Sequence, residues 1–398
     1  GIPSASSDVV IDGPVSFATG AAPGYSCRNL TVTSRGSIFE RTGYYFYEQT
    51  LTVNGNIINN GTVRNAGSRG FVLRVKGNIT NNATWTILRT ELNGTGTQTL
   101  TAASGKKFEC TLTVDTTARP AIAAGTDLAF SGAVDLGKST LDMKNFAVAL
   151  YGASANIGNG NIVNAKDISG WPLPNIYGTP AYPILDNITY DGSPNIKGRF
   201  LINSNVTLKG AVTVSDTVEE KTGYYDYEKT LSIKGNLVNN GIMRNVGSRG
   251  LILNITGNVT NNGKWQFTRT ELSGNTDQTL TLGTGKQFES SFSVTDSTRG
   301  MIVAGSGLAF TQGFNLGKAT LDMKSFAVSL NGPSSNIYNG NVINARDISG
   351  APLKNIYGTP SYPVLDNITY DGNPTIKGRF LINSNVTLKG AVIVSDTV

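Results

Sequence analysis

The sequence predicts an all-β protein folded as a parallel β-helix, or β-solenoid, of stacked coils of about 22 residues each. A short repeat carries this prediction first: LTVNGNIINNG at Leu51 returns as LRVKGNITNNA at Leu73. A long repeat supports it, because residues 39–218 align with residues 219–398 without an insertion or deletion. Composition agrees, since the chain holds 47 glycines and many Asn and Thr residues, which suit strands and tight turns better than helices.

The long repeat divides the chain into three parts. We assign residues 1–38 to an N-terminal cap or first coil, residues 39–218 to the first solenoid copy and residues 219–398 to the second. The short repeat occurs in both copies, because Leu231 and Leu253 begin the matching segments in the second. The same spacing disfavours the other all-β architecture considered, tandem β-sandwiches of about 90 residues. No Pro/Gly/Ser linker separates the copies, so we expect the strand pattern to continue between them.

Asn-Gly and Asn-Asn-Gly groups lie at the ends of the short repeats. Glycine and asparagine tolerate the positive φ of tight turns, and stacked asparagine amides can hydrogen-bond from coil to coil. Each coil leaves its strand edges unpaired unless another coil stacks on it at about 4.8 Å. We therefore expect turns at these groups and strand pairing between successive coils.

Apolar and polar residues alternate in the segments between the turns. Trp85 and Ile87 alternate with threonines in the first copy, and Trp265 and Phe267 alternate with Lys and Gln in the second. We expect the tryptophan positions to face the core and the variable polar positions to face water. A further series of short strands is predicted over residues 134–150, with turns at Gly137-Lys138 and Lys144-Asn145.

Two proline-rich stretches interrupt this pattern, from Trp171 to Pro183 and from Pro352 to Pro363. Proline cannot donate to a strand ladder, and the alternation of apolar residues is lost in both stretches. We expect them to form loops that leave the solenoid.

Composition excludes several classes of function. The chain has no histidine, which rules out Ser-His-Asp triads, Cys-His dyads and histidine-ligated zinc or haem. The net charge of +6 is scattered rather than gathered into a basic stripe, so we expect no nucleic-acid partner. No apolar run approaches the roughly 18 residues of a membrane span. We expect no cofactor.

An aromatic run, TGYYFYE at Thr42, returns as TGYYDYE at Thr222. Because Asp replaces Phe at one position, that position must tolerate water, and a period of two then places alternate residues on the outer face. Tyr45 and Tyr47 would face inward. The alternative is that the tyrosines stack along the solenoid and bind nothing. A tyrosine beside a carboxylate could stack on sugar rings. The candidate ligand-binding surface therefore consists of Tyr44, Phe46, Glu48, Tyr224, Asp226 and Glu228.

The two cysteines, Cys27 and Cys110, are about four coils apart in this scheme, which is further than a disulfide can span. We interpret them as buried free thiols, while a bridge would need the N-terminal segment to fold back or a second subunit to supply a partner. The second copy has Ser290 in place of Cys110.

Aspartates recur at matching places in the two copies. A glycosidase needs two facing carboxylates and a calcium site needs several converging oxygens, and the spacing here fits neither. We interpret these residues as turn and cap aspartates and assign no catalytic or metal-binding residue. The pairs are Asp142/Asp322, Asp167/Asp347, Asp186/Asp366 and Asp191/Asp371.

Several segments resemble the β-strand-repeat surface proteins exported by Bacteroidota. They are SDVVIDGP at Ser7, CRNLTVT at Cys27, LTVNGNIINNGTV at Leu51 and the GTGTQTL and GNTDQTL segments at Gly94 and Gly274. The resemblance covers residues 5–118 and the matching part of the second copy, and is one of repeat style rather than of a catalytic motif.

The resemblance implies a secreted, cell-surface protein of adhesin-like or filament-forming type. We therefore expect an extracellular structural or adhesive repeat protein without enzymatic activity, a stalk or filament segment that presents a repeated surface. Its expected partners are other copies of itself, by end-to-end or lateral assembly, and polysaccharide or a cell surface. The alternative function is a polysaccharide-binding or polysaccharide-degrading β-helix protein.

Overall fold

The computed structural model describes residues 3–17, 24–40, 48–67, 70–115, 117, 121–174, 177–222, 227–247, 250–295, 300–354 and 360–396. Within these ranges every regular element is a β-strand, as the sequence predicts. None of the described residues belongs to a helix of the length and hydropathy needed to cross a membrane. Internal contacts divide the chain into an N-terminal unit, Gly1–Leu201, and a C-terminal unit, Ile202–Val398.

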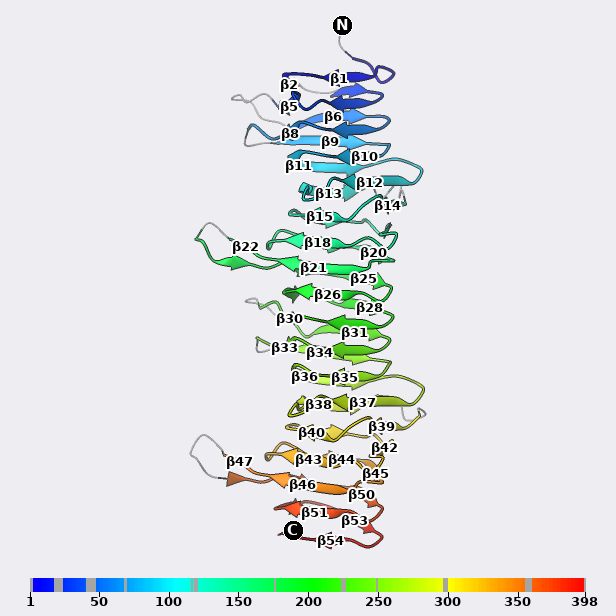
Figure 1. Ribbon diagram of the computed structural model, residues 1–398, viewed down its shortest axis with the longest axis vertical. Coiled ribbons are helices and arrows are strands. Elements are labelled where there is room, and N and C mark those ends of the chain that lie inside the picture. The colour runs from blue at the N-terminus through cyan, green and yellow to red at the C-terminus, as the bar shows by residue number, and fades with distance from the viewer. Residues whose placement is uncertain are drawn as a thin grey trace. The chain divides into compact units, whose positions relative to one another are not determined.

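The N-terminal unit is a β-solenoid with three strands in each turn, and each strand pairs in parallel with the strands of the turns before and after it (Figure 1). The segment predicted to be a cap or first coil contributes strands to all three ladders. The first ladder consists of β1 (Val9–Ile11), β4 (Leu30–Val32), β7 (Ile57–Asn59), β10 (Ile79–Asn81), β12 (Gln98–Ala102), β14 (Ile122–Ala124), β17 (Thr140–Asp142), β20 (Gly160–Val163) and β25 (Ile188–Asp191).

The second and third ladders share the long strand β11 (Thr84–Leu92), whose register shifts between Thr86 and Arg89 where the chain turns from one face to the next. The second ladder consists of β2 (Pro14–Phe17), β5 (Ser37–Glu40), β8 (Thr62–Arg64), the start of β11, and then β15 (Leu128–Phe130), β18 (Val148–Tyr151), β21 (Asp167–Trp171) and β26 (Asn195–Gly198). The third consists of β3 (Tyr25–Cys27), β6 (Gln49–Val53), β9 (Phe71–Val75), the end of β11, β13 (Glu109–Val114), β16 (Val134–Asp135), β19 (Asn156–Gly158) and β24 (Ile184–Leu185).

The C-terminal unit has the same three parallel ladders. The first consists of β29 (Val212–Val214), β32 (Leu237–Asn239), β35 (Val259–Asn261), β37 (Gln278–Leu282), β39 (Ile302–Ala304), β42 (Thr320–Asp322), β45 (Gly340–Ile343), β50 (Ile368–Asp371) and β53 (Val386–Lys389). The second consists of β30 (Thr217–Glu220), β33 (Ile242–Arg244), the start of β36 (Lys264–Leu272), and then β40 (Leu308–Phe310), β43 (Val328–Asn331), β46 (Asp347–Ala351), β51 (Thr375–Gly378) and β54 (Ile393–Val394). The third consists of β28 (Val206–Lys209), β31 (Lys229–Lys234), β34 (Leu251–Ile255), the end of β36, β38 (Glu289–Val294), β41 (Phe314–Asn315) and β44 (Ile337–Tyr338), followed by the pair β49 (Val364–Leu365) and β52 (Leu381–Ile382).

The short repeat seen in the sequence is the repeat of one turn. Leu51 pairs directly with Leu73 in the N-terminal unit, and Leu231 pairs directly with Leu253 in the C-terminal unit. The predicted turn pairs also adopt the expected conformation, because φ is 52° at Gly137, 72° at Lys138, 50° at Lys144 and 67° at Asn145. The predicted parallel β-solenoid is therefore confirmed.

Large apolar side chains from successive turns fill the core. Trp85 is 1% exposed, and its ring contacts that of Phe108, which in turn stacks on Phe130 at 5.8 Å between centroids. Trp265, Phe288 and Phe310 repeat this series in the C-terminal unit. The inward positions predicted for the tryptophans are confirmed, and their burial removes apolar surface from water along each unit.

Buried asparagines at the turns form ladders of side-chain hydrogen bonds. Asn59 Nδ2 donates to Asn81 Oδ1 at 2.9 Å, and Asn239 Nδ2 donates to Asn261 Oδ1 at 2.8 Å. The four side chains have no exposed surface, so the stacked amides replace hydrogen bonds that water would otherwise make. The predicted coil-to-coil pairing of asparagines is confirmed.

Both proline-rich stretches leave the ladders, as predicted, although each forms a short antiparallel pair rather than an open loop. In the N-terminal unit the pair is β22 (Leu173–Pro174) with β23 (Pro180–Ala181), and in the C-terminal unit it is β47 (Leu353–Lys354) with β48 (Pro360–Ser361). Figure 1 shows each pair projecting from the side of its own unit. Trp171 differs from the expectation because it ends the ladder strand β21.

Candidate ligand-binding surfaces

The predicted aromatic surface falls mainly on residues that the structure does not describe. Tyr44, Phe46, Tyr224 and Asp226 lie outside the described residues, so their predicted roles stay predictions. Glu48 and Glu228 are described, and both are exposed. The neighbouring Tyr227 corresponds to Tyr47 and is 81% exposed, so it does not have the inward position expected for Tyr47.

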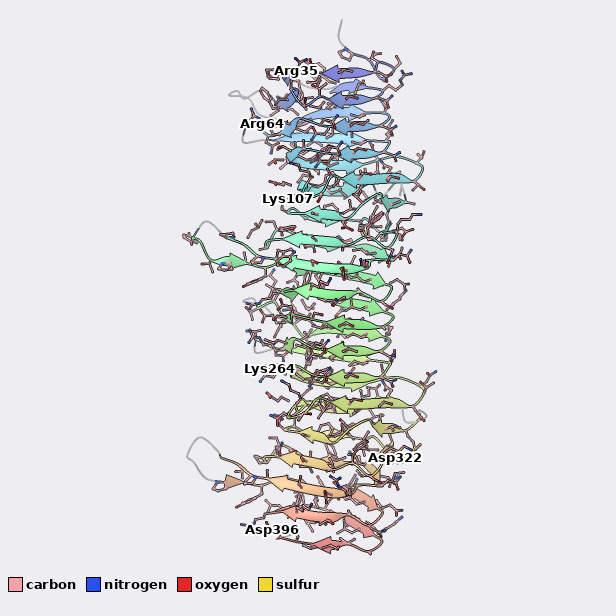
Figure 2. The ribbon with its side chains drawn as sticks, in the orientation of Figure 1. Arg35, Arg64, Lys107, Lys264, Asp322 and Asp396 are labelled. Carbon is pink, nitrogen blue, oxygen red and sulfur yellow. The ribbon has the colours of Figure 1, made fainter. Side chains whose placement is uncertain are left out.

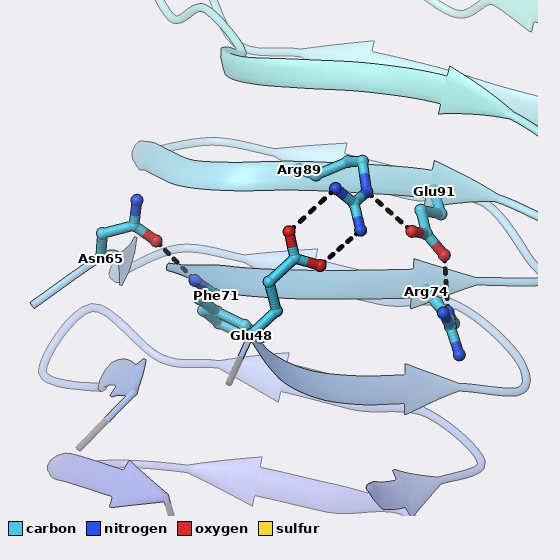
Figure 3. A network of polar contacts seen from close by, with 6 residues as sticks. All are labelled: Glu48, Asn65, Phe71, Arg74, Arg89 and Glu91. Carbon is cyan, nitrogen blue, oxygen red and sulfur yellow. Dashed lines mark hydrogen bonds and ion pairs between the residues drawn. The ribbon is translucent and has the colours of Figure 1, made fainter. Parts of the chain in front are cut away.

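Glu48 belongs to a network of alternating charges on the outside of the N-terminal unit (Figure 3). Arg89 donates from Nη2 to Glu48 Oε2 at 2.7 Å and from Nε to Glu91 Oε1 at 2.7 Å. Arg74 Nε donates to the other oxygen of Glu91 at 2.5 Å. Burial works to raise the pKa of Glu91, but the hydrogen bonds from Arg74 and Arg89 outweigh it and lower that pKa. The two arginines and two glutamates therefore pair with one another across three turns.

The C-terminal unit has a reduced form of this network. Arg269 Nε donates to Glu271 Oε1 at 2.7 Å, as Arg89 does to Glu91, but Asn254 stands in the position of Arg74. Asn254 Nδ2 donates to Glu271 Oε2 at 3.2 Å. The network thus loses the charge of Arg74, while the hydrogen bond between β34 and β36 is kept, which indicates a role in joining turns.

Two buried glutamates were not identified from the sequence. Glu40 accepts hydrogen bonds from the backbone amides of Ala66 at 2.9 Å and Gly67 at 2.7 Å. In the C-terminal unit Glu220 accepts from Gly247 N at 3.0 Å and lies 3.8 Å from the ammonium of Lys229. A buried carboxylate is stable only with such partners, so these side chains fix the backbone that follows β8 and β33. The signal in the sequence was that Glu40 and Glu220 occupy matching positions in the two copies.

Cys27 and Cys110 are both buried and free, as predicted. Burial raises the pKa of each thiol to about 11. Cys110 Sγ lies 3.3 Å from Thr90 Oγ1, and Ser290 makes the same contact with Thr270 at 2.8 Å in the C-terminal unit. A thiol held protonated in this way is a poor nucleophile, so these residues serve packing.

The recurring aspartates lie at turns and pair with local groups. Asp142 Oδ1 accepts from Lys144 N and from Asn164 Nδ2, each at 2.9 Å, and Asp322 has the equivalent partners. Asp167 pairs with Lys197 at 3.0 Å. Burial works to raise the pKa of Asp142, but these hydrogen bonds outweigh it and lower that pKa. In the described part of the chain no three acidic or cysteine side chains are grouped so that they could hold a metal ion.

The sequence interpretation also missed a groove on the N-terminal unit beside Lys107. It has a volume of about 560 Å³ and lies between the turn that precedes β13 and the strands β15 and β18. Figure 2 places Lys107 on the side of the unit from which the β22–β23 pair projects. Lys107 Nζ lies 5.6 Å from the centre of the Tyr151 ring and 3.1 Å from Glu109 Oε1. The signal in the sequence was a difference between the copies, because Lys107 and Tyr151 become Gln287 and Asn331.

Comparison of the chain with protein-family models, with curated proteins and with solved structures finds no match.

Proposed function

We propose that this protein is an extracellular structural repeat protein, a stalk or filament segment whose repeated surface serves attachment or self-assembly. The observation that carries the proposal is the reproduction of turn-to-turn contacts in both units. The asparagine ladder, the aromatic series in the core and the buried glutamates each recur 180 positions apart. A solenoid is stabilised by contacts between neighbouring turns, so reiteration of a unit adds length without requiring a new core.

The chemistry of the described side chains supports a structural role over a catalytic one. The charged groups of the outer network pair with one another, and the turn aspartates pair with backbone amides and asparagines. The cysteine thiols are buried with raised pKa values, which is the opposite of a reactive thiol. An extracellular place for the protein rests on its resemblance to exported surface proteins.

Immunogold labelling of intact cells of the source organism tests this proposal. An antibody against the folded 398-residue chain should label fibres or a layer at the surface of unpermeabilised cells. A matched sample after permeabilisation serves as the control for antibody access. Labelling that appears only after permeabilisation would overturn the extracellular role.

A further inference from the structure

The two copies of the repeat differ on one outer face in a concerted way. In the N-terminal unit this face carries Lys107, Tyr151 and Trp171, on three different turns. At the matching positions the C-terminal unit has Gln287, Asn331 and Ala351. A cation and two aromatic rings are thus replaced together by two amides and a methyl group. Because the surrounding fold is the same, the fold alone does not require the aromatic set.

We propose that the groove beside Lys107, Tyr151 and Trp171 binds a polysaccharide of neutral pyranose sugars, and that only the N-terminal unit carries this site. The inference concerns residues other than those that support the structural role, so either can fail without the other.

The register of the strands brings the two aromatic residues together. Tyr151 and Trp171 are direct partners in the parallel pair β18–β21, so their backbones are about 4.8 Å apart. Both point outward, because the residues that precede them, Leu150 and Gly170, face the core. The Trp171 side chain is 49% exposed. The two aromatic residues are therefore neighbours on the outer face of this ladder.

Small residues form part of the lining of the groove. Ala129 and Ala149 are neighbours in the pair β15–β18 and line it, together with Ala147. Phe146 and Tyr151 also line it. A volume of about 560 Å³ is typical of ligand pockets, which range over about 300 to 1,000 Å³. The small and apolar residues of the lining therefore leave room for the apolar faces of pyranose rings.

Polar groups at the rim suit sugar hydroxyls. Ser104, Lys106, Thr126 and Asp127 line the groove, supplying both donors and acceptors of hydrogen bonds. Asp127 Oδ1 already accepts from Ala147 N at 2.8 Å. Lys107 is paired with Glu109 at 3.1 Å, so its charge is compensated. With Lys106 and Asp127 also of opposite sign, the rim has no excess of positive charge to favour an acidic polymer over a neutral one.

On the equivalent face of the C-terminal unit, the replacing side chains hydrogen-bond to each other. Asn331 Nδ2 donates to Gln287 Oε1 at 3.2 Å, so the two amides that replace Tyr151 and Lys107 bind each other. Ala351 offers no ring for stacking. This unit therefore provides natural replacements that the fold accepts.

Trp171 makes the binding directly observable. The chain has three tryptophans, and the other two, Trp85 and Trp265, are each 1% exposed. Acrylamide in solution should therefore quench Trp171 far more than the buried pair, and a sugar stacked on Trp171 should shield it. The probes are soluble xyloglucan, arabinoxylan and galactomannan, with polygalacturonate as the acidic comparison. Retardation of the native protein in gels that contain each polymer gives an independent measure of binding.

The variants exchange the two faces within the full chain. Lys107→Gln, Tyr151→Asn and Trp171→Ala together give the N-terminal unit the residues of the C-terminal unit, and far-UV circular dichroism verifies that the variant folds. The reciprocal variant carries Gln287→Lys, Asn331→Tyr and Ala351→Trp. Tyr227→Ala is the matched control, because Tyr227 is an exposed aromatic residue beside the other predicted surface.

We expect at least one neutral polymer to shield Trp171 and to retard the parent chain, with retardation weakened about tenfold or more in the first triple variant and unchanged by Tyr227→Ala. The reciprocal variant should be retarded more strongly than the parent, because it has two sites. The proposal is overturned if no neutral polymer shields Trp171, if only polygalacturonate binds, or if Tyr227→Ala abolishes retardation while the triple variant keeps it.

Discussion

Replacing Asn81 by alanine should destabilise the N-terminal unit far more than the same change at its neighbour Asn82. Asn81 Oδ1 accepts from Asn59 Nδ2 at 2.9 Å and from Ala83 N at 3.3 Å, and its Nδ2 donates to Lys107 O at 3.2 Å. The Asn81 side chain has no exposed surface, so water cannot replace these partners in the variant. Asn82 Nδ2 also donates across one turn, to Asn60 Oδ1 at 2.8 Å, but both side chains are exposed.

The expected magnitudes follow from the number of bonds and their burial. Three hydrogen bonds of a buried side chain, at about 0.5 to 1.5 kcal/mol each, give about 1.5 to 4.5 kcal/mol for Asn81→Ala. Asn82→Ala should cost about 0.5 kcal/mol or less, since water takes over the freed groups. Urea titration of both variants measures the difference close to the site when Trp171 and Trp265 are replaced by phenylalanine, so that the buried Trp85 is the only fluorescent tryptophan. With an m value of about 2 kcal/mol/M, the midpoint for Asn81→Ala should fall by about 1 M or more.

Asn261 and Asn262 repeat the same comparison in the C-terminal unit. Asn261 is buried and accepts from Asn239 at 2.8 Å, whereas Asn262 is exposed and donates to Asn240 at 2.9 Å. Equal midpoint shifts for the buried and exposed asparagines, in either unit, would refute the claim that the inner ladder stabilises the solenoid.

Three further predictions concern the thiols, the pH dependence and the glycines. Cys27 and Cys110, with pKa values of about 11, should react with Ellman's reagent at about pH 8 only after denaturation, and rapid reaction of the native protein would contradict their burial. The pKa of Asp322 is lowered because hydrogen bonds from neighbouring groups outweigh the effect of burial. The stability that Asp322 contributes is therefore complete above the unfolded pKa near 3.8 and is lost as the pH falls through the lower folded pKa. Asp322→Asn should reduce the fall in Tm between about pH 6 and about pH 3, and an unchanged fall would count against this linkage. Gly198→Ala should lower the free energy of unfolding by about 3 kcal/mol or more, and Gly105→Ala by about 1 kcal/mol. Both glycines have φ of 73°, but only at Gly198 would an added Cβ meet a backbone oxygen, at 1.9 Å. Calorimetry that finds equal losses for the two variants would contradict this close approach.

The regular part of the fold could be predicted from the sequence because each of its causes is local and repeated. The pairing of Leu51 with Leu73 follows from a 22-residue spacing, and the turn at Lys144 follows from residues that tolerate positive φ. The inward position of Trp85 follows from alternation with period two. These features need no information about which distant residues meet, because the partner of each strand lies one turn away.

The surfaces were harder to predict, since they depend on contacts between side chains of different turns. The Glu40 carboxylate binds backbone amides that follow the next strand of its ladder, and no pattern in the sequence marks an amide as a partner. The groove beside Lys107 is lined by residues from three turns, and the sequence of any one of these turns does not indicate a groove. We predict a loop from Trp171 to Pro183 because this proline-rich stretch lacks alternation, although Trp171 completes the ladder strand β21. Comparing the two copies position by position would have singled out Tyr151 and Trp171, because both aromatic residues are lost from the second copy.

Cross-linking across one turn tests the central claim, the parallel register of successive turns, most directly. Thr80 pairs with Thr101 in the register of β10 and β12, and Thr80 also pairs with Ile58 on the turn before. In a background with Cys27→Ser and Cys110→Ser, the double variant Thr80→Cys/Thr101→Cys should form a disulfide on mild oxidation, because direct partners are about 4.8 Å apart. Ile58→Cys/Thr101→Cys, two turns and about 9.6 Å apart, should not. Peptide mapping that finds the second bridge as readily as the first, or only the second, would contradict the register and the solenoid built on it.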